Sequence, residues 1–428
     1  MCRPLRGLCC LSFLLSPSII TFPRTQMISV EEALKIIVDN ATPLSTQTVA
    51  TEKALSFVSV NDILADRPLP PFNRVAMDGY AVRSADFDSS EVELKLKGQV
   101  QTGIESELEI EAGEAVNIMT GAPCPQGADA VVKVENSELK GDTVILREEK
   151  MYPGLNVAIK GEDKSQGDLL VRSGKPLSAA DIAVAASVGL AEIEVYKKPR
   201  VKIISTGTEI VHPSVKPLPH QIRDCNSYSL RTMCNRYQLD NEFLGIGEDD
   251  EEVLSGLIQK GLDSEILLLS GGVSMGDYDH VPNLLAGNGV KKIFHKIKVK
   301  PGKPVWFGKT DNGTYVFGLP GNPVSVQTCF RIFVEPLIKK LSGYMQPHHM
   351  FLKLPLSEDA KSKTPRDHYT PGKIKATASA TEIEPVYIRG SGDFSNFADS
   401  QGLFLMPGAK RILKKGELVD FLPWSDTW

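Results

Sequence analysis

Three apolar runs in the second half of the chain each end in a turn that carries glycine, proline or polar residues. KIIST runs into GTE at 207–209, EILLLS into GGVSMGDYD at 271–279, and YVFGL into PGNPVS at 320–325. Glycine lets a ligand approach the backbone closely, and Asn322 followed by Pro323 is typical of a helix start with oriented N–H donors. These turns suit an anionic ligand, although similar turns also occur as plain connections.

A run of lysines lies between the second and third of these turns. HKIKVKPGK contains Lys296, Lys298, Lys300 and Lys303, in a chain whose formal net charge is -5. On a β-strand, residues 296, 298 and 300 share one face, and ammonium groups beside glycine-rich turns suit a phosphate or another oxyanion. The alternative is a solvated surface, which is the usual role of a charge run.

Carboxylates are the remaining candidates for acid, base or metal chemistry, because the familiar catalytic motifs are absent. The sequence contains no GxxxxGK[ST], HExxH, GxSxG or GxGxxG pattern. Oxygen ligands suit Mg²⁺ that is held partly by phosphates. We predict Mg²⁺ as the cofactor, Asp249 and Asp279 as its ligands, and Asp78 and Glu209 as further functional carboxylates. Capping of neighbouring turns is the alternative role for these side chains.

Composition excludes several classes of partner. A net charge of -5 and a pI of about 5.9 argue against a nucleic-acid or anionic-membrane surface, which needs a basic stripe. The cysteines form no CxxC pair, so neither a zinc site nor a disulfide framework is predicted and a cytoplasmic, reducing location is favoured. The length of 428 residues indicates about three domains or more.

The elements that must position these residues indicate a multidomain α/β and β protein. Strands alternate with helices over 199–345, which predicts an α/β domain with a mostly parallel sheet. Ligands of such sheets bind outside the carboxyl ends of the strands, so the three turns should line one cleft. The region from 346 to 428 is predicted to be a small all-β domain.

The first half of the chain is predicted to hold a helical, discontinuous N-terminal domain, 27–70 plus 165–198. Its helices are expected after Ser29, through DILAD at 62–66, and from Ser178 to Gly189, packing together. Short alternating runs separated by Gly, Pro and Asp predict an inserted small antiparallel β-barrel over 71–164. Residues 1–26 are interpreted as a leader or a non-native start, because a capped helix begins at Ser29.

Seven ordered motifs resemble the molybdopterin molybdenumtransferase family, which includes the E domain of gephyrin. They are PPFNRVAMDGYAVR, IMTGAPCPQGADAVV, ISTGTEI, QIRDCNS, LLSGGVSMGDYDHV, KVKPGKPVWFG and GLPGNPVSV, and the similarity runs from about Ser29 to Trp428. The resemblance implies an enzyme that takes adenylated molybdopterin and molybdate, uses a divalent cation such as Mg²⁺, hydrolyses the adenylate and leaves molybdenum on the dithiolene. It also implies a homodimer whose cleft lies between the α/β domain of one subunit and the N-terminal domains of the other.

The resemblance also assigns roles to residues. The catalytic residues it implies are Asp78, Thr120, Glu209, Asp249 and Asp279. The candidate substrate-binding residues are Asn226, Ser270, Gly271, Gly272, Ser274, Lys296, Lys300, Pro320, Gly321, Asn322, Pro323 and Ser325. PRDHYTPGK departs from the family's usual basic pattern, so Arg366, Ser391 and Ser395 are secondary candidates for contact with molybdate.

Two other functions stay open at this point. Gephyrin-like proteins also act as scaffolds, and the α/β domain is similar to the pterin adenylyltransferases. The MDGYA motif and the barrel segment favour the molybdenum-inserting arrangement over the second alternative. We expect the adenylated substrate to come from a separate molybdopterin adenylyltransferase, an upstream partner of this chain.

Overall fold

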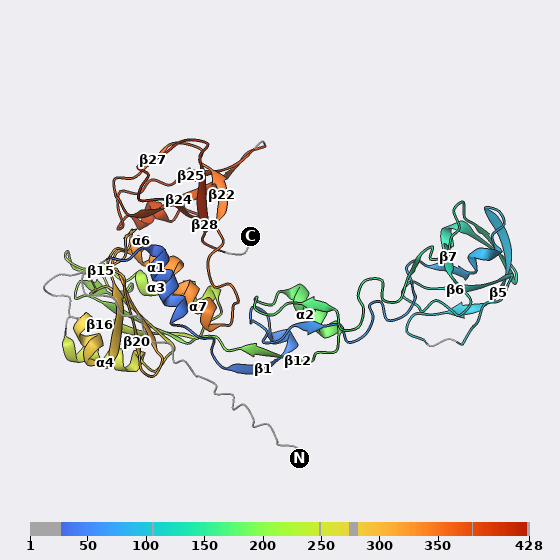
Figure 1. Ribbon diagram of the computed structural model, residues 1–428, viewed down its shortest axis with the longest axis horizontal. Helices are drawn as coiled ribbons and strands as arrows, with labels where there is room; N and C mark the ends of the chain where they lie inside the picture. Colours follow the sequence, from blue (N-terminus) through green and yellow to red (C-terminus); the bar gives the residue numbers. More distant parts are fainter. Residues whose placement is uncertain (1–26, 105–106, 248–249, 274–280, 379, 426–428) are drawn as a thin grey trace, which may run out of the picture.

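The computed structural model describes residues 27–104, 107–247, 250–273, 281–378 and 380–425. The molecule is elongated: an α/β region and a β region lie together near one end, and a narrow arm leads to a second β region at the other end (Figure 1). Within the described residues, no helix is long and apolar enough to cross a membrane.

A six-stranded sheet forms the centre of the α/β region. Its order is β16 (Asn241–Gly247), β13 (Val201–Thr206), β17 (Ile266–Ser270), β21 (Tyr315–Leu319), β20 (Trp306–Thr310) and β18 (Val290–His295). The first four strands are parallel, and β20 is antiparallel to both of its neighbours. All residues of β17 and β21 are buried, as expected for strands covered on both faces. The predicted mostly parallel sheet is confirmed, with β20 as an additional strand.

Helices cover both faces of this sheet. Helices α4 (Glu251–Gly261) and α5 (Val281–Gly287) pack on one face through residues such as Ile258 and Leu285. On the other face lie α3 (Asn226–Arg236), α6 (Pro323–Cys329) and α7 (Glu335–Leu341), whose apolar residues share one cluster with Ile203, Leu268 and Phe317. Both faces of the sheet are therefore covered by helices, and only the ends of its strands can contact a ligand.

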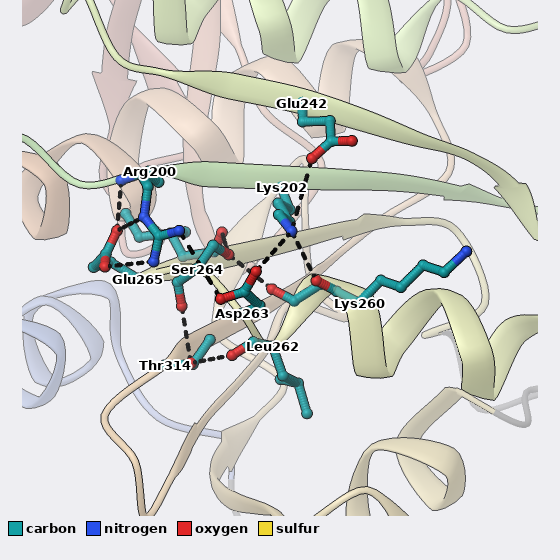
Figure 2. Close-up of polar contacts among 11 residues, drawn as sticks. Arg200, Lys202, Glu242, Lys260, Leu262, Asp263, Ser264, Glu265 and Thr314 are labelled. Carbon is teal, nitrogen blue, oxygen red and sulfur yellow. Dashed lines mark hydrogen bonds and ion pairs between the residues drawn. The ribbon is translucent and has the colours of Figure 1, made fainter.

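Charged groups secure the amino-terminal edge of the sheet (Figure 2). The Arg200 guanidinium donates to both carboxylate oxygens of Glu265 at 3.1 Å, joining the starts of β13 and β17. Lys202 Nζ donates to the Lys260 carbonyl at 3.0 Å, and Thr314 Oγ1 donates to the Ser264 carbonyl at 2.8 Å. Because these groups bind one another, this edge has a structural role, and the opposite edge is the candidate for ligand binding.

The first helix, α1 (Val30–Asp39), begins as the sequence predicts but packs elsewhere. Ser29 accepts from the Glu32 amide while Glu32 accepts from the Ser29 amide, so the capping box is present. Its buried face, which includes Ala33 and Ile37, joins the core of the α/β region and contacts α7. The expected packing of this helix with other N-terminal helices is wrong, because its apolar face covers α7 instead.

The arm is mainly extended chain. Strand β1 (Thr46–Ala50) pairs with β12 (Glu192–Tyr196), and β2 (Ile63–Leu64) pairs with β11 (Leu169–Val171), so two distant segments build one unit. The discontinuity is therefore as predicted, and α2 (Ala179–Ser187) begins at its Ser178 cap. The helix expected through DILAD is wrong: the preceding VSV and the Ile63 side chain favour extended pairing, since β-branched residues pack well on strands.

The β region at the far end of the arm has six strands in the order β7, β4, β6, β5, β9 and β8. These are Ala130–Lys133, Gly79–Val82, Glu114–Ile118, Glu91–Val100, Thr143–Arg147 and Ser137–Lys140. Strands β5 and β6 are parallel and the other pairs are antiparallel, so the predicted purely antiparallel barrel is wrong at this pair. The remaining arm strands, β3 (Arg74–Val75) and β10 (Val157–Ala158), pair with each other where the chain enters and leaves this region.

The C-terminal region is a β-sheet with one short helix, α8 (Phe394–Phe397). Its strands are β22 (Leu352–Pro355), β24 (Asp367–Ala376), β25 (Thr381–Pro385), β26 (Gly402–Met406) and β28 (Leu418–Pro423). A small pair adds β23 (Ala360–Lys361) and β27 (Ile412–Leu413). Strand β19 (Val299–Lys300) leaves the α/β region and pairs with β24, so the two regions share a sheet.

A buried ion pair joins the α/β region to the last strand. Arg331 lies in a π-helical turn, Phe330–Val334, between α6 and α7, and its guanidinium binds Glu335 while its Nε donates to the Pro423 carbonyl at 3.0 Å. Tyr237 donates to the same carboxylate at 3.0 Å. Both charged side chains are fully buried, so each depends on the other for compensation.

We expect Glu335→Leu to lower the free energy of unfolding by about 3 to 5 kcal/mol, because it leaves the Arg331 charge buried without its partner. The double variant Arg331→Met/Glu335→Leu should recover much of that loss, since an apolar pair needs no compensation. Urea denaturation measures both. The exposed pair Lys35–Asp39 offers the control: Asp39→Ala should cost less than about 1 kcal/mol. Equal losses at the two sites would contradict this account.

Candidate functional site

A cleft of about 500 Å³ opens at the carboxyl ends of β13, β17 and β21. Its lining includes all three turns that the sequence predicts to meet. The predicted residues in this lining are Glu209, Asn226, Gly271, Gly272, Pro320, Gly321, Asn322 and Pro323. The structure thus brings together residues that lie more than a hundred positions apart in the chain, because parallel strands end at the same edge.

Two glycines determine how closely the backbones approach in this cleft. Gly271 has φ +101°, and a Cβ there would lie 2.5 Å from the Thr206 carbonyl oxygen. Gly272 has φ +64°, and its Cβ would lie 2.5 Å from a methyl group of Val281. A side chain at either position would therefore separate the ends of β13 and β17 and narrow the cleft.

Asp224 is the buried centre of the cleft's hydrogen bonds. Its carboxylate accepts from the Asn226 amide at 3.0 Å and from Ser227 through both the amide at 3.1 Å and Oγ at 2.6 Å. Ser205 Oγ on β13 donates to it at 3.0 Å. With four donors around it, this carboxylate positions its neighbours and has little capacity left for a ligand.

Asn226 extends this network to the other two turns. Its Nδ2 donates to Ser270 Oγ at 2.9 Å and to the Gly321 carbonyl at 2.7 Å. Ser270 is itself fully buried and does not line the cleft. This predicted binding residue therefore supports the wall of the cleft through its hydrogen bond to Asn226. The Asn226 side chain thus joins the end of β17 to the turn after β21, and Asp224 links both to Ser205 on β13.

A second cavity, about 390 Å³, adjoins the cleft and lies between the α/β and C-terminal regions. The two cavities share Pro304, Pro320 and Asn322 in their walls. Two further predicted residues, Lys300 and Ser325, line the second cavity. Its other charged lining residues are Lys303, Lys361, Arg366 and Arg389, and no Asp or Glu of the described chain lines it.

Burial, together with neighbouring positive charge, lowers the pKa of groups in this basic cavity. Burial lowers the pKa of Lys300, and Arg366 and Lys363 lower it further. Burial likewise lowers the pKa of His368 to about 4, with Lys300 and Arg366 contributing. The Thr370 hydroxyl, also in the lining, is buried without a hydrogen-bond partner among the described residues. The cavity therefore offers hydrogen-bond donors and uncompensated positive charge, which favours binding of an anion.

The lysine run is not one continuous strand, which corrects the prediction. Strand β18 ends at His295, Lys296 has φ +72°, and β19 covers only Val299–Lys300. A left-handed residue breaks the alternation on which the shared face depended. Lys296 and Lys298 line neither cavity, and the Lys298 charge acts on Glu32 at the start of α1.

Asp78 and Thr120 lie together, but far from both cavities. Asp78 Oδ1 accepts from the Thr120 amide at 2.6 Å and from Thr120 Oγ1 at 2.8 Å. Those two hydrogen bonds lower the pKa of Asp78, which is exposed to solvent. Asp78 precedes β4 and Thr120 follows β6, in the region at the opposite end of the long axis from the cleft (Figure 1). One chain does not bring this pair to the cleft.

Three predicted residues, Asp249, Asp279 and Ser274, lie outside the described residues. Carboxylates in the described part of the cleft are Glu209, Asp224, Asp250 and Glu251. Asp224 is saturated by donors, and Asp250 accepts from two amides at the start of α4. Across the described residues, no group of three His, Cys, Asp or Glu side chains is placed to hold a metal ion. These residues alone do not provide a ligand set for Mg²⁺.

Several site residues were missed or undervalued in the sequence. Arg366, His368 and Thr370 alternate at the start of β24 and line the basic cavity together. Alternation in PRDHYT is typical of a strand with one polar face, so this signal was present. Ser391 also lines the cavity and accepts from Asn322 Nδ2 at 3.0 Å, whereas Ser395 does not line it.

Comparison with known proteins decides the family. Three family profiles match in order: the MoeA N-terminal region (domain I and II) at 28–189, the probable molybdopterin binding domain at 202–340, and the MoeA C-terminal region (domain IV) at 353–424. The molybdopterin molybdenumtransferase of Staphylococcus aureus strain MRSA252 is 30% identical over 400 residues, which cover 92% of this chain and 95% of that protein. The chain belongs to the molybdopterin molybdenumtransferase family.

Other members of the molybdopterin molybdenumtransferase family and solved structures agree with this placement. The enzyme of that name from Staphylococcus epidermidis strain ATCC 12228 is 29% identical over 401 residues, 92% of this chain and 95% of its own. The molybdopterin biosynthesis MoeA protein from Pyrococcus horikoshii has a TM-score of 0.78 at 32% identity, covering 94% of this chain and all of that one. A molybdenum cofactor biosynthesis protein from Pyrococcus furiosus, 18% identical with a TM-score of 0.58, shares the fold.

The Asp224 network yields a direct test. Asp224→Ala leaves two buried hydroxyl groups and two amides without their acceptor, so we expect the free energy of unfolding to fall by roughly 1 to 3 kcal/mol or more. Asp224→Asn should cost less, because an amide oxygen still accepts. Asp311→Ala, at an exposed carboxylate bound to Lys291, is the matched control and should change little. A neutral result for Asp224→Ala would rule out the positioning role.

Proposed function

We propose that this chain is a molybdopterin molybdenumtransferase, which hydrolyses adenylated molybdopterin and inserts molybdenum from molybdate into the dithiolene of the pterin. The observation that carries the proposal is the pair of adjoining cavities with different chemistry, in a chain of this family. An organic substrate in the cleft and an oxyanion in the basic cavity would meet at the shared wall of Pro304, Pro320 and Asn322. Proximity of two bound reactants is itself a large part of catalysis.

Molybdate is assigned to the basic cavity. It is a tetrahedral dianion, and charge-assisted hydrogen bonds from lysine and arginine suit its oxygens. Donors that the described lining offers include Lys300, Arg366 and the Thr370 hydroxyl, which has no hydrogen-bond partner among the described residues. The pterin supplies the sulfur ligands of molybdenum, so the absence of cysteine from the described lining fits this assignment.

Adenylated molybdopterin is assigned to the cleft. Gly271 and Gly272 let the backbone come close to a phosphate, and Leu254, Val281 and Leu284 supply an apolar wall for a ring system. Glu209 lines the cleft and is the described carboxylate available there for acid or base work. Mg²⁺ remains the predicted cofactor, with Asp249 and Asp279 as its ligands. The dependence of AMP release on added Mg²⁺ tests the requirement for this cation.

A homodimer is proposed as the working unit, with the arm of one subunit reaching the cleft of the other. This rests on the separation of Asp78 and Thr120 from both cavities within one chain, and on the exposure of that pair. A cytoplasmic location and an upstream molybdopterin adenylyltransferase that delivers the substrate complete the proposal. Scaffolding alone is the alternative, and turnover separates the two.

The decisive experiment incubates the purified protein with adenylated molybdopterin, molybdate and Mg²⁺ and measures AMP release and active cofactor. We expect both products. Lys300→Ala should raise the molybdate requirement by roughly 10- to 150-fold, the range for loss of a charge-assisted hydrogen bond. Lys298→Ala is the matched control, because this neighbouring lysine lines neither cavity. Binding of both ligands without AMP release would favour the scaffold role.

Mixed dimers test the shared site. At a molybdate concentration near the wild-type requirement, Asp78→Ala and Lys300→Ala subunits should each be nearly inactive alone. A random mixture should regain about a quarter of wild-type activity, because half of the dimers hold one intact site. Asp78→Ala mixed with Thr120→Ala is the control and should regain nothing, since both changes affect the same end of the arm. Absence of recovery in the first mixture, with dimers present, would contradict the proposal.

A further inference from the structure

In the described lining of the basic cavity, His368 lies among positively charged side chains and no carboxylate. Strands β19 and β24 are parallel, and their register pairs Lys300 with His368. Paired residues of a parallel ladder lie side by side on the same face of the sheet, so the ammonium and the imidazole face the basic cavity together. The only carboxylate beside it in sequence, Asp367, alternates away and accepts from the Gly408 amide at 3.0 Å.

Every Lys, Arg, Asp or Glu side chain in the described lining of the cavity around His368 is a lysine or an arginine. Lys300 comes from β19, Lys303 from the turn after it, and Lys361 from β23. Arg366 precedes His368 on its own chain segment, and Arg389 comes from the loop before α8. A second positive charge on this wall is unfavourable until an anion enters.

The imidazole is held so that it can exist in either charge state. His368 Nδ1 lies 3.1 Å from Ser362 Oγ, and this hydroxyl is buried. A hydroxyl can donate to a neutral ring nitrogen or accept from a protonated one, so the same contact serves both states. When Ser362 donates to the neutral ring, Nε2 already carries the hydrogen. Proton uptake at Nδ1 then adds positive charge, which makes Nε2–H a stronger donor to a ligand oxygen.

We propose that His368 takes up a proton when an oxyanion enters the basic cavity, so that anion binding by this protein is proton-coupled. This rests on the proposed function only in taking the cavity as an oxyanion site. The bound dianion supplies a counterion, and the protonated imidazole becomes a charge-assisted donor to it. Proton-coupled binding makes the affinity for molybdate depend on pH.

The sign of the pH dependence follows from the empty state. The pKa of His368 in the empty cavity is lowered to about 4, so the ring is neutral at pH 7. An anion raises that pKa, and between the two values the complex holds one proton more than the free protein. Affinity should therefore rise as pH falls through the pKa of the complex, by up to about 10-fold for each pH unit, and level off near the value of the empty state.

Calorimetric titration of the full chain with molybdate and with sulfate, in two buffers of different protonation enthalpy, tests the proposal. Sulfate is a tetrahedral dianion that does not itself titrate in this range. We expect the wild type to take up about one proton per anion near pH 5. His368→Gln should bind both anions with no such uptake and with a flat pH profile, whereas His212→Gln, at an exposed histidine outside both cavities, should behave as the wild type.

A spectroscopic measurement on the wild type avoids dependence on any variant. The ¹³Cε1 resonance of His368 in histidine-labelled protein should titrate at higher pH when sulfate is present. Binding without proton uptake and with an unmoved His368 titration would overturn this inference while leaving the oxyanion site intact. No binding of either anion at any pH would instead remove the oxyanion site, and with it both proposals.

Discussion

Parallel pairing of β13, β17 and β21 is the constraint on which the rest of the structure depends. Because these strands run in one direction, their carboxyl ends and the turns that follow meet at one edge of the sheet. The opposite edge is occupied by ion pairs and hydrogen bonds such as Arg200 with Glu265, which hold the strands in register (Figure 2). The buried Asp224 and Asn226 then connect Ser205, Ser270 and Gly321, which hold the described walls of the cleft together.

Charge is divided between the two cavities by their position in the fold. The cleft takes its carboxylates from the α/β region, whereas the basic cavity takes Lys300 from β19 and Arg366 and Arg389 from the C-terminal region. Strand β19 is the link, since it leaves the α/β region and pairs with β24. The buried pair of Arg331 and Glu335, with its contact to Pro423, fixes how the two regions meet. The geometry of the basic cavity thus depends on groups distant from it.

The arm separates Asp78 and Thr120 from the cleft of their own chain. Asp78 and Thr120 form a pair with short hydrogen bonds. The arm that contains β1 and β12 lies between this pair and the cleft of the same chain. The proposed homodimer would bring this exposed carboxylate to the cleft of the other subunit. Stability of the arm and activity of the cleft should therefore be coupled only through assembly.

The sequence by itself determined the family, the parallel α/β domain, the capped starts of α1 and α2, and the three turns of the cleft. These depend on local patterns: apolar runs, capping residues and glycines whose conformation is set within a few positions. Only the tertiary structure decided that α1 covers α7, that β5 and β6 are parallel, that Lys296 turns out of its strand, and that Arg366, His368 and Thr370 join Lys300 in one cavity. Those outcomes depend on which surfaces meet after the chain has folded, and contacts between residues far apart in the chain leave no periodic signal in either partner.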